Sequence, residues 1–144
     1  MENYFQDETL LGNEKIKEAM FLYYENESDE LYAAACLAVR ERMKNGGHFL
    51  FPADIENNED GTPLFLFNTL VVQGYCLIAA FTDREEFEKA PPTGVVSLPI
   101  VSMLENIMQQ EVFAGIIINP WGDQLVLCKS DIAMILAPDS EDLT

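Results

Sequence analysis

The chain of 144 residues has the length of one domain, and its composition of 49% hydrophobic and 23% charged residues argues against a disordered segment. Its 25 Asp and Glu residues outnumber its 8 Lys and Arg residues, which gives a formal net charge of −17. Affinity for nucleic acid comes largely from cations that neutralise phosphates, so this charge argues against nucleic acid and acidic membranes as partners. The acidic surface is either simply solvated, or it steers a basic protein partner toward the molecule.

The cysteines and the first residues of the chain bear on where the protein works. Cys36, Cys76 and Cys128 are widely spaced, each lies in an apolar stretch, and no CxxC motif occurs. This pattern is typical of buried thiols in a reducing cytosol, and it fits neither a disulfide framework nor a zinc site. Residues 1–10 are acidic and lack the basic and apolar regions of a signal peptide. We therefore expect a cytoplasmic protein.

Two amphipathic helices are expected after an N-terminal arm of residues 1–13. The first is indicated by an apolar stripe at helical spacing, which consists of Ile16, Ala19, Met20 and Tyr23. The second begins after Ser28, whose hydroxyl can accept hydrogen bonds from free N–H groups, and ends at Asn45-Gly46-Gly47. The two helices are expected to form a hairpin.

Strand patterns follow the helices. Residues 48–55 predict a strand that ends at Pro52, and Asp60-Gly61 predicts a turn. The apolar run at residues 64–81 has the length of a membrane span, but polar residues interrupt it. Its content of Val, Phe, Tyr and Ile favours strands, so we expect two buried antiparallel strands joined by a turn at Gln73-Gly74.

The rest of the chain alternates between helix and strand. We expect a helix at residues 83–90, with capping-box spacing at Thr82 and Glu85, and then a strand at Val95 and Val96. The next helix has Pro99 in its first turn, and its apolar stripe consists of Ile100, Leu104, Ile107 and Met108. A central strand at Gly115–Ile118, its partner at Leu125–Cys128 and a last helix capped by Ser130 complete the series. The fold class is therefore α+β. We predict one domain over residues 14–138, with a mixed, mostly antiparallel sheet of about five or six strands flanked by helices, and an acidic tail at residues 139–144.

The turn between the last two predicted strands is the candidate binding site. Pro120 fixes φ and Gly122 permits a positive φ, so the sequence at 119–123 has what a simple chain reversal needs. A tryptophan at a loop tip is unusual, because such a large apolar ring is a common anchor in interfaces. We expect Trp121 to be at least partly exposed on a partner-binding surface, although its ring could instead fold back onto the sheet. The residues of this predicted surface are Asn119, Pro120, Trp121, Gly122 and Asp123.

Two segments carry a resemblance to a known family. They are AAFTDREEFEKA at residues 79–90 and AGIIINPWGDQLVL at residues 114–127, and they follow two helices and a strand in the expected order. This order and spacing resemble the N-terminal domain of the SseB family, named for enhanced serine sensitivity in bacteria, over most of residues 14–136. The resemblance implies a mixed α/β fold and a bacterial protein with no established catalytic residues or cofactor.

The sequence gives little support for catalysis. His48 is the only histidine, so a Ser/His/Asp or Cys/His mechanism would depend on it, and no supporting motif surrounds it. Residues 56–67 resemble a calcium loop, but Phe67 stands where a bidentate glutamate is needed. The pair Glu85-Glu86 is explained by the first turn of a helix, where negative charge is favourable. We expect no catalytic residue, no metal and no cofactor.

The expected function is that of a non-catalytic protein-interaction or regulatory module in a bacterial cytoplasmic protein. A basic protein is the expected partner, with neither nucleic acid nor a membrane involved. The alternative is an enzyme that acts on a small molecule through His48 and nearby carboxylates. A pocket that converges on His48 would favour the enzyme.

Overall fold

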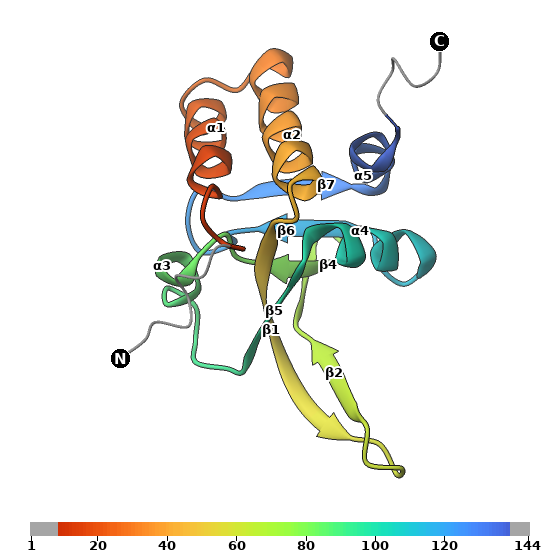
Figure 1. The fold of residues 1–144 in the computed structure, drawn as a ribbon. Helices are drawn as coiled ribbons and strands as arrows, with labels where there is room; N and C mark the ends of the chain where they lie inside the picture. Colours follow the sequence, from red (N-terminus) through yellow and green to blue (C-terminus); the bar gives the residue numbers. More distant parts are fainter. Residues whose placement is uncertain (1–8, 139–144) are drawn as a thin grey trace.

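Two helices, α1 (Glu14–Glu25) and α2 (Asp29–Lys44), lie side by side at the start of the computed structural model, which describes residues 9–138 (Figure 1). The Oγ atom of Ser28 accepts a hydrogen bond from the N–H of Leu31 at 3.2 Å and so caps α2. At the other end, Gly46 has a φ of +79°, a conformation that suits glycine. The predicted helical hairpin and its start and stop signals are confirmed.

The described residues form seven strands in two sheets. The three-stranded sheet has the order β2-β1-β5, with β1 at His48–Asn57, β2 at Pro63–Phe67 and β5 at Val95–Pro99. The four-stranded sheet has the order β3-β4-β6-β7, with β3 at Thr69–Val72, β4 at Tyr75–Ala80, β6 at Gly115–Ile118 and β7 at Leu125–Cys128. The other helices are α3 (Arg84–Phe87), α4 (Ile100–Gln109) and α5 (Lys129–Leu136). The α+β class is confirmed, with two sheets in place of one sheet of five or six strands.

Strand β1 does not end at Pro52, which corrects the sequence-based boundary. Its first half pairs with β5, and its second half, from Ala53 on, pairs with β2. The N–H of Leu50 bonds to the carbonyl of Phe81 at 2.9 Å, and this bridge joins the two sheets. The backbone nitrogens of alternate residues in a strand point to the same side, so the nitrogen of Pro52 points to the same side as that of Leu50. It lies between the bridge at Leu50 and the start of the pairing with β2. A missing N–H is tolerated at this change of partner.

The apolar run at residues 64–81 contributes to both sheets. Its hairpin is confirmed, because β3 and β4 are antiparallel and Gln73 and Gly74 have φ values of 53° and 86°. The first part of the run is β2 of the other sheet, and Asn68 separates β2 from β3. The expectation of two buried strands is confirmed for β4, which is mostly buried, and is wrong for the first part of the run, because most of β2 and β3 is exposed. Among the described residues, no helix has the length and apolar character to cross a membrane.

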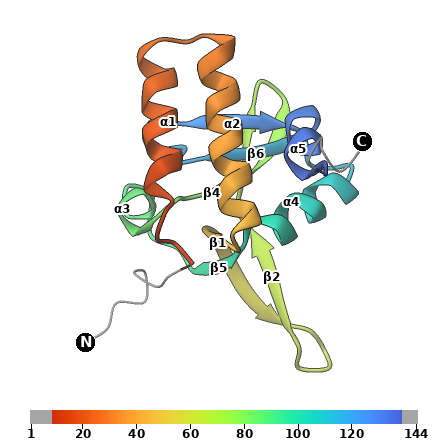
Figure 2. The ribbon, with the colours of Figure 1, turned by 45° about the horizontal axis from the view of Figure 1, so that its top comes forward.

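The main core lies between the helices and one face of the four-stranded sheet. Figures 1 and 2 show α1, α2, α4 and α5 on this side. The sheet contributes alternate residues, as expected for strands with a period of two: Ile78, Ala80, Ile116, Ile118, Leu125 and Leu127. The predicted stripe of α4 faces this core, with Met108 partly buried at its edge. The β1–β2 hairpin extends from this body as an arm (Figure 1).

Residues 9–13, part of the predicted N-terminal arm, pack against the domain. Leu10 is buried with Leu50 and Phe81, and the carbonyl of Thr9 accepts a hydrogen bond from the N–H of His48 at 2.8 Å. Residues 1–8 of the arm and the acidic tail at residues 139–144 lie outside the described residues. The packed part of the domain therefore includes the segment before α1.

The start of α5 differs from the prediction. Cys128, and not Ser130, is its N-cap. The backbone N–H of Cys128 donates a hydrogen bond to Oδ2 of Asp131 at 3.3 Å, and the Sγ atom of Cys128 lies 3.2 Å from the same oxygen. The observed N-cap lies two residues before the predicted one, because Asp131 supplies the reciprocal hydrogen bond of a capping box to Cys128.

Candidate functional site

The candidate site lies where β4 and β6 end. These two strands are parallel neighbours, with Ala80 paired to Ile118, so the segments that follow them begin at the same edge of the sheet. In α/β sheets such edges are frequent places for binding sites. This topology brings Thr82 next to the turn at residues 119–123, although they are far apart in the sequence.

Asn119 fixes the start of the turn. It is 2% exposed and has a φ of 54°, a left-handed conformation that asparagine tolerates better than most residues. Its Oδ1 accepts a hydrogen bond from the N–H of Thr82 at 2.9 Å, and its Nδ2 donates to Thr82 Oγ1 at 3.0 Å. Its carbonyl closes the turn by accepting from the N–H of Gly122 at 3.0 Å. Asn119, and not Gly122, therefore provides the left-handed residue.

A buried polar network connects this turn to the helical hairpin. Asn13, which is also buried, donates through Nδ2 to the carbonyl of Thr82 at 2.8 Å and to the carbonyl of His48 at 2.9 Å. Its Oδ1 accepts from Nε of Arg42 at 2.9 Å. Three separate parts of the chain, at Arg42, His48 and Thr82, thus converge on Asn13, and Thr82 in turn holds Asn119.

The role of Thr82 in this network corrects its predicted role as a helix cap. Asp83 caps α3 instead, because its Oδ1 accepts from the N–H of Glu86 at 3.0 Å. The helix is also shorter than predicted and covers Arg84–Phe87 in place of residues 83–90. The sequence signal at Thr82 and Glu85 had the right spacing for a capping box but was shifted by one residue.

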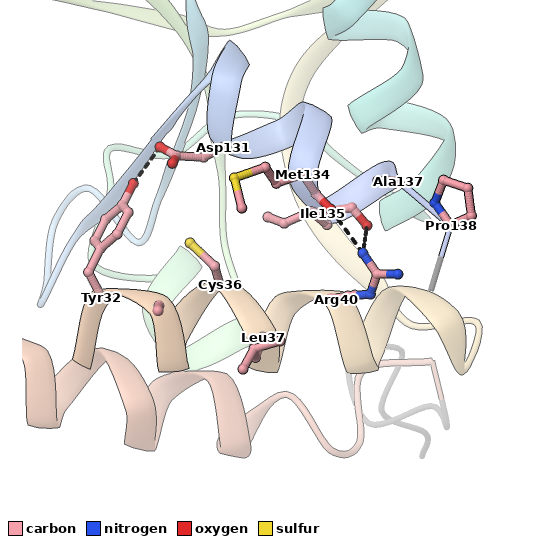
Figure 3. Close-up of a pocket in the computed structure, with 10 residues that line it drawn as sticks. Tyr32, Cys36, Leu37, Arg40, Asp131, Met134, Ile135, Ala137 and Pro138 are labelled. Carbon is pink, nitrogen blue, oxygen red and sulfur yellow. Dashed lines mark hydrogen bonds between the residues drawn. The ribbon is translucent and has the colours of Figure 1, made fainter. Parts of the chain in front are cut away.

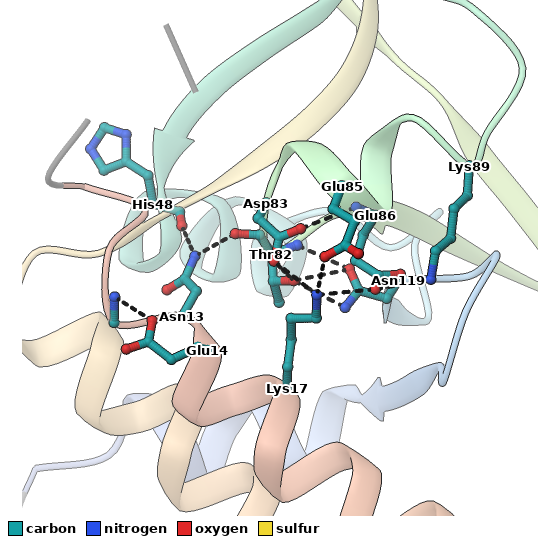
Figure 4. Close-up of polar contacts among 11 residues, drawn as sticks. Asn13, Glu14, Lys17, His48, Thr82, Asp83, Glu85, Glu86, Lys89 and Asn119 are labelled. Atoms are coloured by element: carbon teal, nitrogen blue, oxygen red, sulfur yellow. Dashed lines mark hydrogen bonds and ion pairs between the residues drawn. The ribbon is translucent and has the colours of Figure 1, made fainter. Parts of the chain in front are cut away.

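Lys17 of α1 lies among the carboxylates of α3 (Figure 4). Its Nζ is 3.2 Å from Asp83 Oδ2, 3.3 Å from Glu85 Oε1 and 3.2 Å from Glu86 Oε2. Partial burial acts to lower the pKa of Lys17, but the charge of Asp83 and the hydrogen bonds to Glu86 and Asp83 outweigh it and leave the pKa raised. The ammonium of Lys17 is therefore held in its charged form and joins α1 to α3.

Glu86 is the buried member of this cluster. It is 6% exposed, and its Oε2 accepts from both Lys17 and Lys89, the latter at 3.1 Å. Its Oε1 is buried and has no hydrogen-bond partner within residues 9–138. A Cβ atom added to Gly122 would lie 2.5 Å from this oxygen, so the glycine permits the close approach of the turn to Glu86. From the sequence, Glu86 was expected to be an ordinary charge in the first turn of a helix, and the burial of its side chain was not predicted.

A small polar cavity adjoins this carboxylate. It has a volume of about 120 Å³ and is lined by Lys17, Met20, Glu86, Lys89, Asn119, Gly122 and Asp123. We call it the polar cavity. Three of its residues belong to the predicted turn, so the turn forms one wall of a site that contains both ammonium and carboxylate groups.

Trp121 borders a second, less polar space. The ring is 53% exposed, which confirms the prediction that it is at least partly exposed. It lines a hollow of about 380 Å³, here called the Trp121 hollow, together with Pro52, Asp54, Asn68, Thr69, Leu70, Ala79, Phe81, Ala90, Pro91, Pro92 and Thr93. Residues 119–123 therefore contribute to two different spaces, with Trp121 lining one and its neighbours Gly122 and Asp123 lining the other.

The five predicted binding residues differ in their accessibility. Trp121 is exposed, Pro120, Gly122 and Asp123 are half-buried, and Asn119 is buried. Asn119 can therefore contribute to binding only by holding the turn in place. The supporting residues Asn13, Thr82 and Glu86 were not predicted, because no local sequence pattern indicates contacts between segments so far apart.

His48 does not approach the carboxylate cluster with its ring. Its Nδ1 lies 3.0 Å from Ser97 Oγ, and Figure 4 shows the ring directed away from Asp83, Glu85 and Glu86. Neither the polar cavity nor the Trp121 hollow is lined by His48. Its backbone carbonyl, in contrast, takes part in the buried polar network. These positions give the enzymatic alternative no geometric support.

A larger groove lies between α2 and α5 (Figure 3). It has a volume of about 680 Å³ and is lined by Tyr32, Ala33, Cys36, Leu37, Arg40, Asp131, Met134, Ile135, Ala137 and Pro138. The hydroxyl of Tyr32 lies 2.7 Å from Asp131 Oδ2, to which it donates, and burial together with this hydrogen bond raises the pKa of Tyr32. Arg40 Nη1 donates to the carbonyls of Met134 and Ile135 at the end of α5. These polar groups serve the packing of the two helices.

The three thiols differ from the expected buried set. Cys128 is exposed, and Cys36 and Cys76 are half-buried, so the prediction is wrong for Cys128. Burial, followed by the influence of Asp131 and Cys128, raises the pKa of Cys36 to about 11. Cys36 is therefore a weakly reactive thiol within the α2–α5 groove.

We expect iodoacetamide to alkylate Cys128 well before Cys36 at pH 8. Alkylation requires the thiolate, and with a pKa of about 11 only about 0.1% of Cys36 is ionised at this pH. Its rate should rise about tenfold per pH unit between pH 8 and pH 10. Timed alkylation followed by peptide mass spectrometry measures both rates, and equal rates at pH 8 would contradict the assignment.

The described part of the chain contains no evident metal site. Within residues 9–138, no three or more His, Cys, Asp and Glu side chains are grouped so that they could hold a metal ion. The carboxylates of Asp83, Glu85 and Glu86 surround the ammonium of Lys17.

Comparison with known proteins gave no match: no protein-family model, no curated protein and no solved structure is significantly similar to this chain. The function is therefore argued below from the geometry and charge of the site.

Proposed function

We propose that the protein is a non-catalytic interaction module of a bacterial cytoplasmic protein, and that the turn at residues 119–123 binds a basic segment of a partner protein. The observation that carries the proposal is the position of Trp121, whose half-exposed ring borders a hollow while the residue two positions before it is locked into a buried network. Tryptophan is among the residues that most often act as anchors in interfaces.

The rigidity of the turn supports this proposal energetically. Association costs free energy when side chains and loops become ordered. Here the hydrogen bonds between Asn119 and Thr82 hold the turn before any partner arrives. The ring of Trp121 has few rotatable bonds and contributes a large apolar area at low entropic cost. The turn is thus prepared for binding in the isolated protein.

The charge of the protein favours a basic partner. The net charge of −17 attracts cations at long range, and Asp54 and Asp123 place carboxylates at the Trp121 hollow and the polar cavity. Electrostatic steering acts mainly on the rate of association. Added salt should therefore slow association more than it changes dissociation.

The resemblance to the SseB family is compatible with this proposal. The two segments that carry it, residues 79–90 and 114–127, are joined in the structure by the hydrogen bonds between Thr82 and Asn119. The resemblance and the cysteine usage are the grounds for proposing a bacterial cytoplasmic protein. They bear on context, and the assignment of the binding surface rests on Trp121.

Replacing Trp121 by Ala should weaken partner binding by about 2 kcal/mol, or roughly 30-fold, because an interface anchor is lost. The stability of the fold should change by no more than about 0.5 kcal/mol, since the ring is half-exposed and lies outside the hydrophobic core clusters. A synthetic library of Lys- and Arg-containing peptides supplies ligands, and titration with the selected peptides measures affinity. Trp121 is the only tryptophan, so a shift in its emission on peptide addition reports contact directly.

Tyr24→Ala is the matched control, because Tyr24 is an equally exposed aromatic residue on α1. Its affinity for the selected peptides should match that of the unmodified protein. Equal binding by the Trp121→Ala variant would reject the proposed surface. A loss of several kcal/mol in stability would show that the ring is a structural support instead.

A further inference from the structure

We propose that the outer edge of β3 pairs antiparallel with the β3 edge of a second copy of this chain, so that two four-stranded sheets join into one continuous sheet. The inference goes beyond the proposed function and does not depend on the Trp121 surface. It starts from the position of β3, whose only strand neighbour among the described residues is β4. The opposite edge of β3 therefore offers backbone groups to a further strand.

The turn at Gln73-Gly74 determines which backbone groups of β3 point outward. Both turn residues have positive φ values, and Val72 pairs with Tyr75 directly across this two-residue loop. The two residues that flank such a loop bond to each other, and along the strand every second residue then bonds to the same neighbour. The N–H and C=O groups of Thr69 and Val71 consequently point away from β4.

These outward groups are complementary to themselves about a two-fold axis. When two β3 strands run antiparallel with Leu70 opposite Leu70 of the second copy, each Thr69 lies opposite a Val71. Each of these residues has one N–H and one C=O group, so every outward group of β3 finds a partner in this single register. A contact of this kind uses the same patch on both copies and is complete once two copies have joined.

The charge distribution indicates that the added strand is another copy and not a basic segment. The sequence has no charged residue between Asp60 and Asp83, although 23% of the chain is charged. Soluble proteins commonly protect an open strand edge with charged side chains. A basic segment would find no carboxylate on β3 to attract it, whereas two copies that each carry a charge of −17 repel each other least where no charge lies.

The neighbouring strands decide between the two uncharged edges, β2 and β3. Opposite β2 lie Asp54 and Glu56 of β1, so carboxylates flank that edge. Opposite β3 lies β4, which has no charged residue. The remaining sheet edges are β5 and β7, and these strands also pack against α4 and α5. The edge of β3 is therefore the one at which a second negatively charged copy meets the least repulsion.

Exposed apolar side chains add to the backbone contact at this edge. Val71 is 71% exposed, Tyr75 is 63% exposed, and Val72 is also exposed. Among the described residues, β3 packs mainly against β4. Pairs of β-branched and other apolar side chains across two strands stabilise a sheet. Because the paired segment is short, the contact is small, and we expect a weak and reversible dimer.

Sedimentation velocity over protein concentrations of about 10 µM to 1 mM measures this self-association. We expect a reversible shift from monomer to dimer, with no larger species, because the contact is closed. Val71→Lys puts a charge on the edge and should raise the dissociation constant of the dimer about tenfold or more. Leu22→Lys is the matched control, because Leu22 is an exposed apolar residue on α1 and the net charge changes equally. This control should dimerise as the unmodified chain does.

The response to salt separates self-association from the binding of a basic partner. Raising NaCl from about 50 to 500 mM screens the repulsion between two copies of charge −17 and should strengthen the dimer about threefold or more. The same addition should weaken the binding of a basic peptide to the turn at residues 119–123. A dimer that salt weakens would contradict the contact proposed here.

Disulfide crosslinking tests the register. Opposed residues of antiparallel strands that share no hydrogen bonds have Cα atoms about 4.5 Å apart, which a disulfide can span. Leu70→Cys should therefore form a linked dimer with oxidised glutathione, which is reduced as the two thiols join. The exposed thiol of Cys128 is first removed by Cys128→Ser. Val72→Cys in the same background lies opposite Asn68 of the second copy, out of reach of its own counterpart, and should not be linked.

A chain that stays monomeric at every concentration would overturn the inference, as would equal crosslinking of the Leu70→Cys and Val72→Cys variants. A dimer that Val71→Lys leaves intact would reject the β3 edge. Circular dichroism shows whether the Val71→Lys variant is folded, and if it is not, the crosslinking of Leu70→Cys decides. Peptide binding that Trp121→Ala weakens in a strictly monomeric protein would support the proposed function and reject the dimer. Dimerisation without any peptide binding would do the opposite.

Discussion

Replacing Asn119 by Ala should lower the free energy of unfolding by about 3 kcal/mol. The substitution leaves the buried N–H of Thr82 without its acceptor and removes the donor to Thr82 Oγ1, which keeps only its hydrogen bond to Asp83 Oδ2, and unsatisfied buried groups cost about 1 to 3 kcal/mol. Alanine must also adopt a φ of 54°, which adds about 1 kcal/mol of backbone strain. Urea denaturation followed by circular dichroism measures the change.

Two further variants separate these contributions. Asn119→Gly accepts the positive φ without strain, so its loss of stability reports the lost hydrogen bonds together with the greater freedom of glycine in the unfolded chain. Pro120→Ala changes the adjacent turn residue and keeps the hydrogen bonds, so we expect a loss below about 1 kcal/mol. A loss of less than 1 kcal/mol in Asn119→Ala would show that Asn119 does not hold the turn as described.

Replacing Lys17 by Met should cost about 2 kcal/mol at pH 7. The carboxylates of Asp83, Glu85 and Glu86 lose their shared cation, and Glu86 is left buried with Lys89 alone. Breaking a fully buried ion pair costs about 3 to 5 kcal/mol, but Lys17 is partly exposed and solvent reduces the effect.

The stabilising effect of Lys17 should depend on pH on the alkaline side. Because the pKa of Lys17 is raised in the folded protein, its stabilising effect is complete below the ordinary value of 10.5 and is lost as pH rises through the raised value. Lys15→Met is the matched control, since Lys15 is an exposed lysine on the same helix. Its loss should stay within about 0.5 kcal/mol. Similar losses in both variants would mean that general charge, and not the cluster, determines stability.

The helices and tight turns could be predicted because their causes are local. Ser28 caps the helix that it precedes, and Gln73-Gly74 adopts the positive φ values that a two-residue hairpin turn needs. The exposure of Trp121 was also predicted, since its sequence neighbours offer too few apolar residues to bury an indole. In each case the relevant atoms lie within a few residues of one another.

The rest of the site could not be predicted because its contacts join distant segments. Nothing near Asn13 or Thr82 in the sequence indicates that they share a network with Asn119. Glu86 has the sequence context of an exposed first-turn glutamate, and only the approach of Gly122 and α1 buries it. The failure at Pro52 has the same origin, because proline ends a strand only if its missing N–H is needed by a neighbour.

The change of pairing partner along β1 also affects how the molecule opens. Beyond Ala53 the strand pairs with β2, and most side chains of this part of the β1–β2 hairpin are exposed. Little apolar area is lost when such a hairpin separates, so the arm can unzip as a local unit while the strands near the core stay paired. Its amide hydrogens would then exchange with solvent through small fluctuations, whereas those of β4 and β6 would require global unfolding. The strands that position the turn at residues 119–123 thus keep their protection while the arm opens and closes.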